Sequence, residues 1–389
     1  MSERDADGVA ESSGGATRRR FLAGASGAAV AATAGCLSVF TGDGNQQGDV
    51  SFSDFRGSGP LVQSRPKLEG TSMDDLTPLS GTLTVYLGGG EGGLYLDLLD
   101  LLTEKYPEFD YKQQLDDSAT LTNRIINEAN AGNVRGDVFL SVDAGSVGAV
   151  TDTGATEKLP ESIREPVPDH YQAAHWVGFA GRARSVPYNT DQYSASELPS
   201  SIDTFATADR FAGAMGWAPT YGAFQSFVTA MRHVRGKDGT RQWLNAMQSQ
   251  QVDSYADEFK VSNAVAEGAL GAGFANHYYA LRVRNARPDA PIDLAFTKND
   301  AGALVNVSAA SVLQGTDQQD LARNLVRHLL TVEAQEFFAT RTFAYPMIPG
   351  VPPVGDLPTI DELNPPDVDL TALSDLQPTI ELLQQTGVL

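Results

Sequence analysis

The sequence predicts an α/β fold with more than one core, and three observations support this fold class. A short apolar run at 83–87 is followed by a glycine-rich turn at 88–93 and then by apolar residues at helical spacing over 94–106. This strand, turn and helix is the opening unit of an α/β layer fold. A second apolar strand is expected at 136–141. At 389 residues, with 41% hydrophobic residues, the chain is long enough for two or three cores.

The remaining elements follow from apolar spacing and from glycine or proline punctuation. Strands are expected at 109–112, 176–179, 184–189, 271–275 and 303–307, and helices at 119–131, 223–235, 239–248, 261–268, 280–285, 319–330, 333–341 and 376–385. Open α/β sheets place ligands at the carboxyl ends of their strands. Glu91, in the first turn, and Asp143, after the strand at 136–141, are therefore candidate cleft residues. For Asp143, a helix N-cap is an equally good interpretation.

The N-terminus indicates an export signal. Arg18-Arg19-Arg20-Phe21-Leu22 matches the twin-arginine pattern, and a small-residue apolar run leads to Thr33-Ala34-Gly35-Cys36. We expect 1–36 to be a signal peptide with a lipobox and Cys36 to carry a lipid. As the chain's only cysteine, Cys36 cannot form an internal disulfide. Residues 37–79 are rich in Gly, Ser, Asp, Gln and Pro, so we expect a flexible tether to the folded part.

The composition is strongly acidic, with a formal net charge of −21. This charge argues against nucleic acid or a bare anionic membrane surface as a partner, because both are polyanions. Acidic residues spread along the chain, together with scarce lysine, are typical of the surface of an extreme halophile. An acidic interaction surface is the alternative, but the chain has no long acidic run.

Two tyrosine-bearing stretches are the candidate ligand-binding segments. Pro219-Thr220-Tyr221-Gly222-Ala223 precedes a predicted helix, and Asn276-His277-Tyr278-Tyr279 lies where a strand passes into a helix. Adjacent tyrosines most often pack with their rings buried. However, side chains at a helix start diverge by only about 100°, so neighbours can serve one site. Phenolate oxygen is also a hard ligand that suits a highly charged ion.

With these elements placed, residues from about 82 to 389 resemble the ferric-iron family of substrate-binding proteins of ABC importers. The resemblance is carried by segments at 136–139, 181–184, 217–220, 276–279, 302–307 and 333–338. It implies a two-lobed α/β periplasmic-binding fold of type II, with two strands crossing a hinge. We expect lobe 1 to comprise 80–183 and 307–345, lobe 2 to comprise 184–306, and 346–389 to form a C-terminal wrap.

The resemblance also implies the site residues. Tyr278 and Tyr279 match the family's tandem iron-binding tyrosines, and Tyr221 matches a third. The histidine and glutamate of other members are absent, since their positions hold Gly90 and Val142. Carbonate or another small anion is expected to complete the shell. The turn that would hold this anion is formed by Thr220, Gly222 and Ala223, with Arg182 and Arg184 nearby; a salt bridge between the lobes is the alternative for either arginine. Asn276 is expected to orient the loop rather than to bind the metal.

These observations predict a monomeric lipoprotein on the outer face of the cell membrane that binds Fe(III) and delivers it to an ABC importer permease. The alternative within this fold is a binding protein for an anionic organic ligand, either a phosphonate or a sugar phosphate. An enzyme is not expected, because no nucleophile elbow, zinc-protease helix motif or catalytic cysteine is present and the five histidines show no ligand spacing.

Overall fold

The computed structural model describes residues 50–89 and 92–389. The predicted signal peptide, Cys36 and Glu91 lie outside the described residues. Within them, no helix has both the length and the apolar character needed to cross a membrane.

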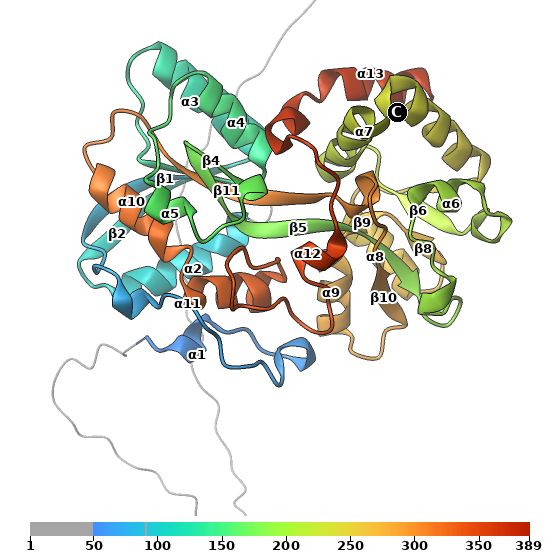
Figure 1. Cartoon of the computed structure of the whole chain (residues 1–389), viewed down its shortest axis with the longest axis horizontal. Helices are drawn as coiled ribbons and strands as arrows, with labels where there is room; N and C mark the ends of the chain where they lie inside the picture. The colour runs from blue at the N-terminus through green and yellow to red at the C-terminus, as the bar shows by residue number, and fades with distance from the viewer. Residues whose placement is uncertain (1–49, 90–91) are drawn as a thin grey trace, which may run out of the picture. The chain divides into compact units, whose positions relative to one another are not determined.

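Strands and helices alternate along the chain, as predicted (Figure 1). The strands are β1 (Gly81–Gly88), β2 (Phe109–Asp116), β3 (Val138–Ser141), β4 (Gln172–Ala173), β5 (Trp176–Asn189), β6 (Met215–Trp217), β7 (Asp253–Ser254), β8 (Ala272–Gly273), β9 (Ala275–Asn276), β10 (Ile292–Ala295) and β11 (Val305–Val312). The helices are α1 (Phe52–Phe55), α2 (Gly92–Lys105), α3 (Ser118–Asn130), α4 (Ala144–Asp152), α5 (Glu161–Arg164), α6 (Ile202–Thr207), α7 (Gly222–Ser249), α8 (Glu258–Ala266), α9 (His277–Ala286), α10 (Gln319–His328), α11 (Val332–Phe337), α12 (Ile360–Leu363) and α13 (Gln377–Gln385). Short helical turns lie at η1 (Pro60–Val62), η2 (Met73–Asp75), η3 (Asp169–Tyr171), η4 (Ala195–Glu197), η5 (Asp209–Phe211), η6 (Ala301–Ala303), η7 (Phe338–Thr342) and η8 (Leu370–Ser374).

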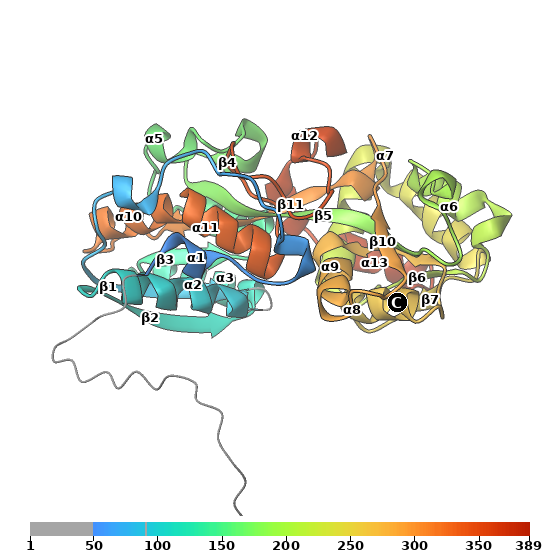
Figure 2. The same cartoon turned by 90° about the horizontal axis from the view of Figure 1, so that it is seen from below.

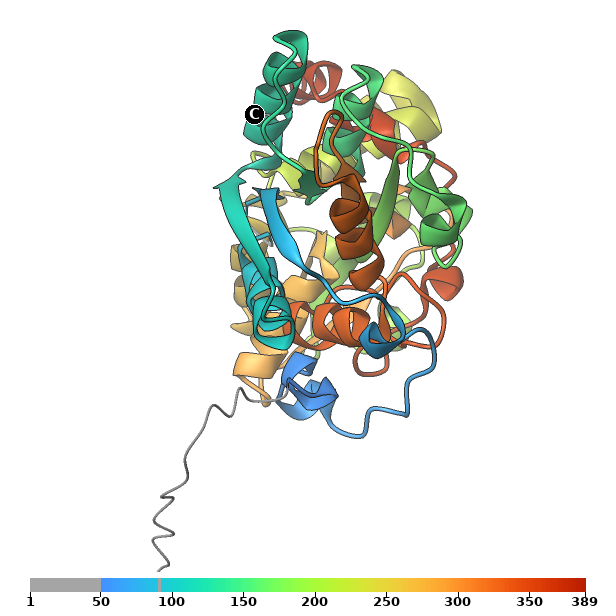
Figure 3. The same cartoon turned by 90° about the vertical axis from the view of Figure 1, so that its left-hand side faces the viewer.

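Two strands, β5 and β11, connect two groups of elements. On one side, β1 pairs in parallel with β2 and β3, and β11 pairs antiparallel with β3. Figure 3 shows β1 and β2 side by side. On the other side, β6 pairs in parallel with β7 and β8. β5 and β11 pair antiparallel with each other and run between the two groups (Figure 1). We call the group around β1 lobe 1 and the group around β6 lobe 2. The expected boundaries near 183 and 306 fall inside β5 and β11.

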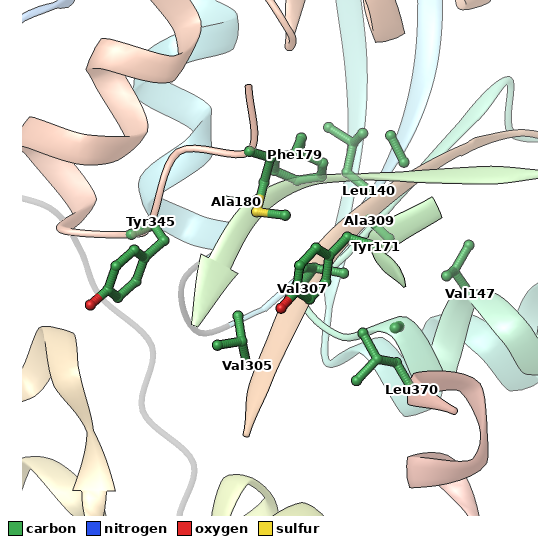
Figure 4. Close-up of a cluster of buried hydrophobic side chains, with 14 of the residues drawn as sticks. Leu140, Val147, Tyr171, Phe179, Ala180, Val305, Val307, Ala309, Tyr345 and Leu370 are labelled. Atoms are coloured by element: carbon green, nitrogen blue, oxygen red, sulfur yellow. The ribbon is translucent and has the colours of Figure 1, made fainter. Parts of the chain in front are cut away.

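A continuous apolar core lies where β5 and β11 meet lobe 1. Phe179 and Ala180 of β5 and Val305, Val307 and Ala309 of β11 are all buried, and they gather in Figure 4. Every residue of β5 and β11 is buried, which is why their sequences show no alternation of polar and apolar residues. Full burial on both faces fixes these strands firmly in the body of the fold.

Residues 50–79 pack against lobe 1, so the expectation of a flexible tether does not hold for this part of 37–79. Phe55, Met73 and Leu79 are each 1% exposed. The segment runs alongside α11 (Figure 2), where Arg65 and Arg56 bind the fully buried carboxylate of Glu336 at 2.5 Å and 2.6 Å. Composition alone did not reveal these contacts, because a few anchoring residues are spaced among many small and polar ones.

The C-terminal segment contacts both lobes. In lobe 1, η8 lies so close to α4 that a Cβ atom added at Gly145 or Gly148 would come within 2.7 Å of Ser374 or 2.6 Å of Thr371. Glycine at these two positions therefore permits the approach. In lobe 2, α13 packs on α7, where the hydroxyl of Thr379 lies 2.7 Å from that of Thr229 and accepts a hydrogen bond from Arg232 at 2.9 Å. The segment thus forms a further connection between the lobes.

Candidate functional site

Two tyrosines from distant parts of the chain meet at their phenol oxygens. Tyr221 immediately precedes α7, and Tyr279 lies in the first turn of α9. Their oxygens are 2.5 Å apart, and their rings meet edge to face with centroids 6.3 Å apart. This separation is short for a hydrogen bond between two hydroxyls, and only one proton can lie between the oxygens.

Tyr278 lies beside this pair. Its ring centroid is 4.4 Å from that of Tyr279, and its oxygen accepts a hydrogen bond of 3.1 Å from the side-chain amide of Asn276. Tyr278 is 2% exposed and Tyr279 is 6% exposed. The strand β9 ends at Asn276 and α9 begins at His277, so the two tyrosines occupy the helix start at which neighbouring side chains diverge by about 100°.

A cleft of about 560 Å³ lies next to these tyrosines and is lined by both lobes. Lobe 1 and the β5–β11 connection contribute mainly polar residues: Asp117, Ser118, Thr122, Asn123, Asp143, Ser146, Arg182 and Asn306. Lobe 2 contributes Tyr221, Gly222, Ala223, Ser226, Asn276 and Tyr278, and Arg184 of β5 faces the same space. The C-terminal segment adds Leu373, Ser374 and Leu376. A cleft between two lobes with polar groups converging from both sides is typical of a binding site for a small solute.

Comparison with known proteins assigns this architecture. Residues 136–368 match the family described as bacterial extracellular solute-binding protein, which is more than half of the chain. The chain belongs to this family. The match confirms the predicted family of solute-binding proteins.

Two curated relatives of this solute-binding protein carry iron in their names. The major ferric iron-binding protein of Neisseria meningitidis serogroup B is 30% identical over 259 residues, which cover 65% of this chain and 78% of the relative. The Fe(3+)-binding periplasmic protein of Serratia marcescens is 26% identical over 275 residues, which cover 69% of this chain and 80% of the relative.

Solved structures confirm the fold. Iron-bound HitA from Pseudomonas aeruginosa superposes with a TM-score of 0.69 at 24% identity, covering 79% of this chain and 99% of that one. The Trichodesmium protein IdiA (FutA), solved in complex with iron and citrate ligands, superposes with a TM-score of 0.65 at 22% identity and the same coverage. These similarities confirm the predicted two-lobed fold, in which strands cross a hinge between the lobes.

The structure places most, but not all, of the candidate anion-binding residues at the cleft. Gly222 and Ala223 line the cleft at the start of α7, where backbone N–H groups have no partner within the helix, whereas Thr220 is exposed and does not line the cleft. Arg182 lines the cleft opposite Asn306 in the β5–β11 ladder. Arg184 donates a hydrogen bond of 2.5 Å from Nη1 to the buried carboxylate of Glu258 in α8, so its ion pair lies within lobe 2 and is not the expected salt bridge between the lobes.

One nitrogen of Arg184 has no hydrogen-bond partner among the described residues. The side chain is 3% exposed, the residue lines the cleft, and the unpaired atom, Nη2, is buried. A buried guanidinium N–H without a partner is unfavourable.

Asp143 and His277 have structural roles. Asp143 caps α4, and its two carboxylate oxygens accept from the backbone N–H of Ser146 at 2.7 Å and from its hydroxyl at 2.9 Å. His277 Nε2 donates to the carbonyl of Phe343 at 2.7 Å, which leaves Nδ1 to accept from the N–H of Ala183 at 3.2 Å. Burial lowers the pKa of His277 to about 4, so the ring is neutral.

Arg282 was missed by the sequence analysis. Its guanidinium carbon lies 4.9 Å from the ring centroid of Tyr278 and 5.5 Å from that of Tyr279. The spacing could have revealed it, because residues three and four apart on a helix are neighbours. A cation at this distance favours negative charge on either phenol.

The described residues hold no cluster of the commoner metal-binding side chains. Among residues 50–89 and 92–389, no group of three or more His, Cys, Asp or Glu side chains is arranged to hold a metal ion.

Proposed function

We propose that this protein binds Fe(III) through the phenolate oxygens of Tyr221, Tyr278 and Tyr279 and delivers it to the permease of an ABC importer. The observation that carries the proposal is the 2.5 Å approach of the Tyr221 and Tyr279 oxygens beside the interlobe cleft. The curated relatives named as ferric iron-binding proteins support the same cargo.

The chemistry follows from the competition between metal and proton. A phenol has an ordinary pKa of about 10, so at neutral pH a metal must displace its proton. A trivalent ion with hard-oxygen preference can do so. Arg282 lies over the rings of Tyr278 and Tyr279 and compensates part of the negative charge that this displacement leaves.

A small anion would complete the iron shell. Its place is between the start of α7, at Gly222 and Ala223, and the side chain of Arg184, with Arg182 nearby. The helix N-terminus and a guanidinium both favour an oxyanion. Carbonate fits this description, and the citrate in the Trichodesmium structure provides a second chemical candidate.

The proposed setting is the outer face of the cell membrane. The twin-arginine pattern at Arg18-Arg19-Arg20 and the small residues before Cys36 support export followed by lipid attachment at Cys36. The acidic, lysine-poor composition supports a halophilic origin, and a monomer is expected to meet its permease directly.

A visible spectrum of the iron-loaded protein tests the function. Phenolate bound to Fe(III) gives a purple charge-transfer band, and Tyr278→Phe should bleach or shift it. A colourless protein after loading with ferric citrate and desalting would contradict iron binding.

The alternative cargo was a phosphonate or sugar phosphate bound at the start of α7. The names of the relatives favour iron over this alternative. Thermal unfolding separates the two cargoes. We expect ferric citrate to raise the melting temperature and methylphosphonate to leave it unchanged, and the reverse result would support the organic anion.

A further inference from the structure

Glu258 is a buried carboxylate that contacts two of the residues around the cleft. It is the first residue of α8 and is 0% exposed. One carboxylate oxygen accepts from Nη1 of Arg184 at 2.5 Å, and the other accepts from the backbone N–H of Asn276 at 2.8 Å. Both oxygens of Glu258 are thus engaged by neighbours of the tyrosine cluster.

The contacts continue from Asn276 to Tyr278. The side-chain oxygen of Asn276 accepts from Nη1 of Arg184 at 3.3 Å, and its nitrogen donates to the phenol oxygen of Tyr278 at 3.1 Å. Arginine can only donate hydrogen bonds, so the amide oxygen of Asn276 must face Arg184. The amide NH₂ group is thereby forced to face Tyr278.

The strand register supports the same geometry. Asn276 of β9 lies directly opposite Arg184 of β5. Glu258 lies on α8, which is outside this ladder, and it binds both partners at once. The orientation of the Asn276 amide therefore depends on Arg184, and the direction of Arg184 depends on Glu258.

We propose that Glu258 is a positioning residue of the iron site. Resting on the proposed function, this inference assigns to Glu258 the task of holding Arg184 and Asn276 so that a hydrogen bond is donated to the Tyr278 oxygen. That bond fixes the direction of the phenol oxygen and favours its anionic, metal-binding form. Partners behind the metal ligands orient those ligands in this way.

The change that tests the proposal is Glu258→Gln, which keeps the size of the side chain. Glutamine carries an NH₂ donor in place of one of the two carboxylate oxygens, so either Arg184 or the backbone N–H of Asn276 loses its acceptor in this geometry. We expect the charge-transfer band of the iron-loaded protein to shift and the iron affinity to fall by about 10- to 100-fold, as for other residues behind metal ligands.

Glu336 provides a matched control. Its side chain is also 0% exposed and is held by two arginines, Arg56 and Arg65, in lobe 1. We expect Glu336→Gln to lower the melting temperature while leaving the charge-transfer band and the iron affinity unchanged. A loss of stability alone in both variants would overturn the proposal for Glu258.

A crystal structure of iron-free Glu258→Gln tests the positioning without any metal. We expect the Asn276 amide to turn and its hydrogen bond to Tyr278 to be lost. If that bond is retained, the proposal is wrong even if iron binding is confirmed. If wild-type protein shows no charge-transfer band, the proposed function fails instead, and the crystal structure still decides the role of Glu258.

Asn276→Ala serves as the second variant. It leaves the Glu258–Arg184 ion pair in place and removes the amide that links Arg184 to Tyr278, so it reports on the same contacts if Glu258→Gln does not fold. We expect Asn276→Ala to shift the band and weaken iron binding. Because both residues act through one chain of contacts, the fold-loss of iron affinity in the double variant should be smaller than the product of the fold-losses in the two single variants. If the fold-loss of iron affinity in the double variant equals the product of the two single losses, the proposal is wrong.

Discussion

The phenol oxygens of Tyr221 and Tyr279, which lie 58 positions apart in the sequence, approach each other to 2.5 Å. One comes from the residue before α7 and the other from the first turn of α9. Two oxygens held this close lose little freedom when a single ion binds both. Such preorganisation reduces the free-energy cost of binding.

Replacing Tyr279 by Phe should remove one ligand while keeping the ring. We expect iron affinity to fall by more than about 100-fold, because losing a ligand should exceed the 10- to 100-fold effect of losing a residue behind it. Competition with a colorimetric chelator measures the affinity. Tyr345→Phe is the control, since Tyr345 is 1% exposed and its oxygen has no hydrogen-bond partner among the described residues. Equal losses in the two variants would contradict the assigned ligand set.

The charge of Arg282 should contribute to iron binding. We expect Arg282→Gln to weaken iron binding by roughly tenfold, because the cation over the rings of Tyr278 and Tyr279 favours phenolate. Arg284→Gln is the control on the same helix, since Arg284 pairs with Asp293 at 2.8 Å and is partly exposed. If both variants bind iron as tightly as the wild type, the cation does not act on the site.

The N-terminal segment should stabilise lobe 1 through Arg65. Arg65→Ala leaves the fully buried Glu336 with only the partly exposed Arg56, so we expect the free energy of unfolding to fall by about 3–5 kcal/mol. Arg56→Ala should cost less, because Arg56 is 31% exposed and Arg65 is 4% exposed. Denaturant unfolding measures both. Unchanged stability of Arg65→Ala would indicate that residues 50–79 do not anchor the fold.

Stability should fall in mild acid because of His328. The ring is buried between the carbonyl of Asn324 and the hydroxyl of Tyr106, with Lys105 nearby, and burial lowers its pKa to about 4. The unfolded chain, with an ordinary pKa near 6.5, binds more protons between these values, so stability is lost as pH falls from about 6.5 to 4. The difference corresponds to about 3 kcal/mol.

Unfolding measured at pH 7 and at pH 4.5 checks this prediction. His328→Gln should lose less stability than the wild type on acidification, whereas the exposed His233→Gln should behave like the wild type. An identical pH dependence for His328→Gln would mean that the buried ring is not the group responsible.

The local pattern was sufficient for much of the fold. The break at Gly236, where φ is 74°, lies between the helices predicted at 223–235 and 239–248. The helix predicted at 280–285 is present but begins three residues earlier, at His277. These features depend on neighbours along the chain. The strand expected at 109–112 extends to Asp116 because pairing with β1 continues past the apolar residues.

Long-range contacts account for what could not be predicted. Arg65 and Glu336 are 271 positions apart, so the packing of 50–79 leaves no local signal. Glu258 lies 18 residues before Asn276 on a different helix, and only the fold shows that it touches the cluster. For Arg184, both an anion contact and a salt bridge between the lobes were open, and the structure shows an ion pair with Glu258 of lobe 2 instead.

The closeness of η8 to α4 and of α13 to α7 has a mechanical consequence. When the lobes rotate about β5 and β11, the chain between Ser374 and Gln377 must bend or slide, because η8 before it packs on lobe 1 and α13 after it packs on lobe 2. The last residues of the protein therefore travel with the opening of the cleft. A fluorescent dye attached near Leu389, paired with one on α4, would report each capture and release of cargo as a change in energy transfer.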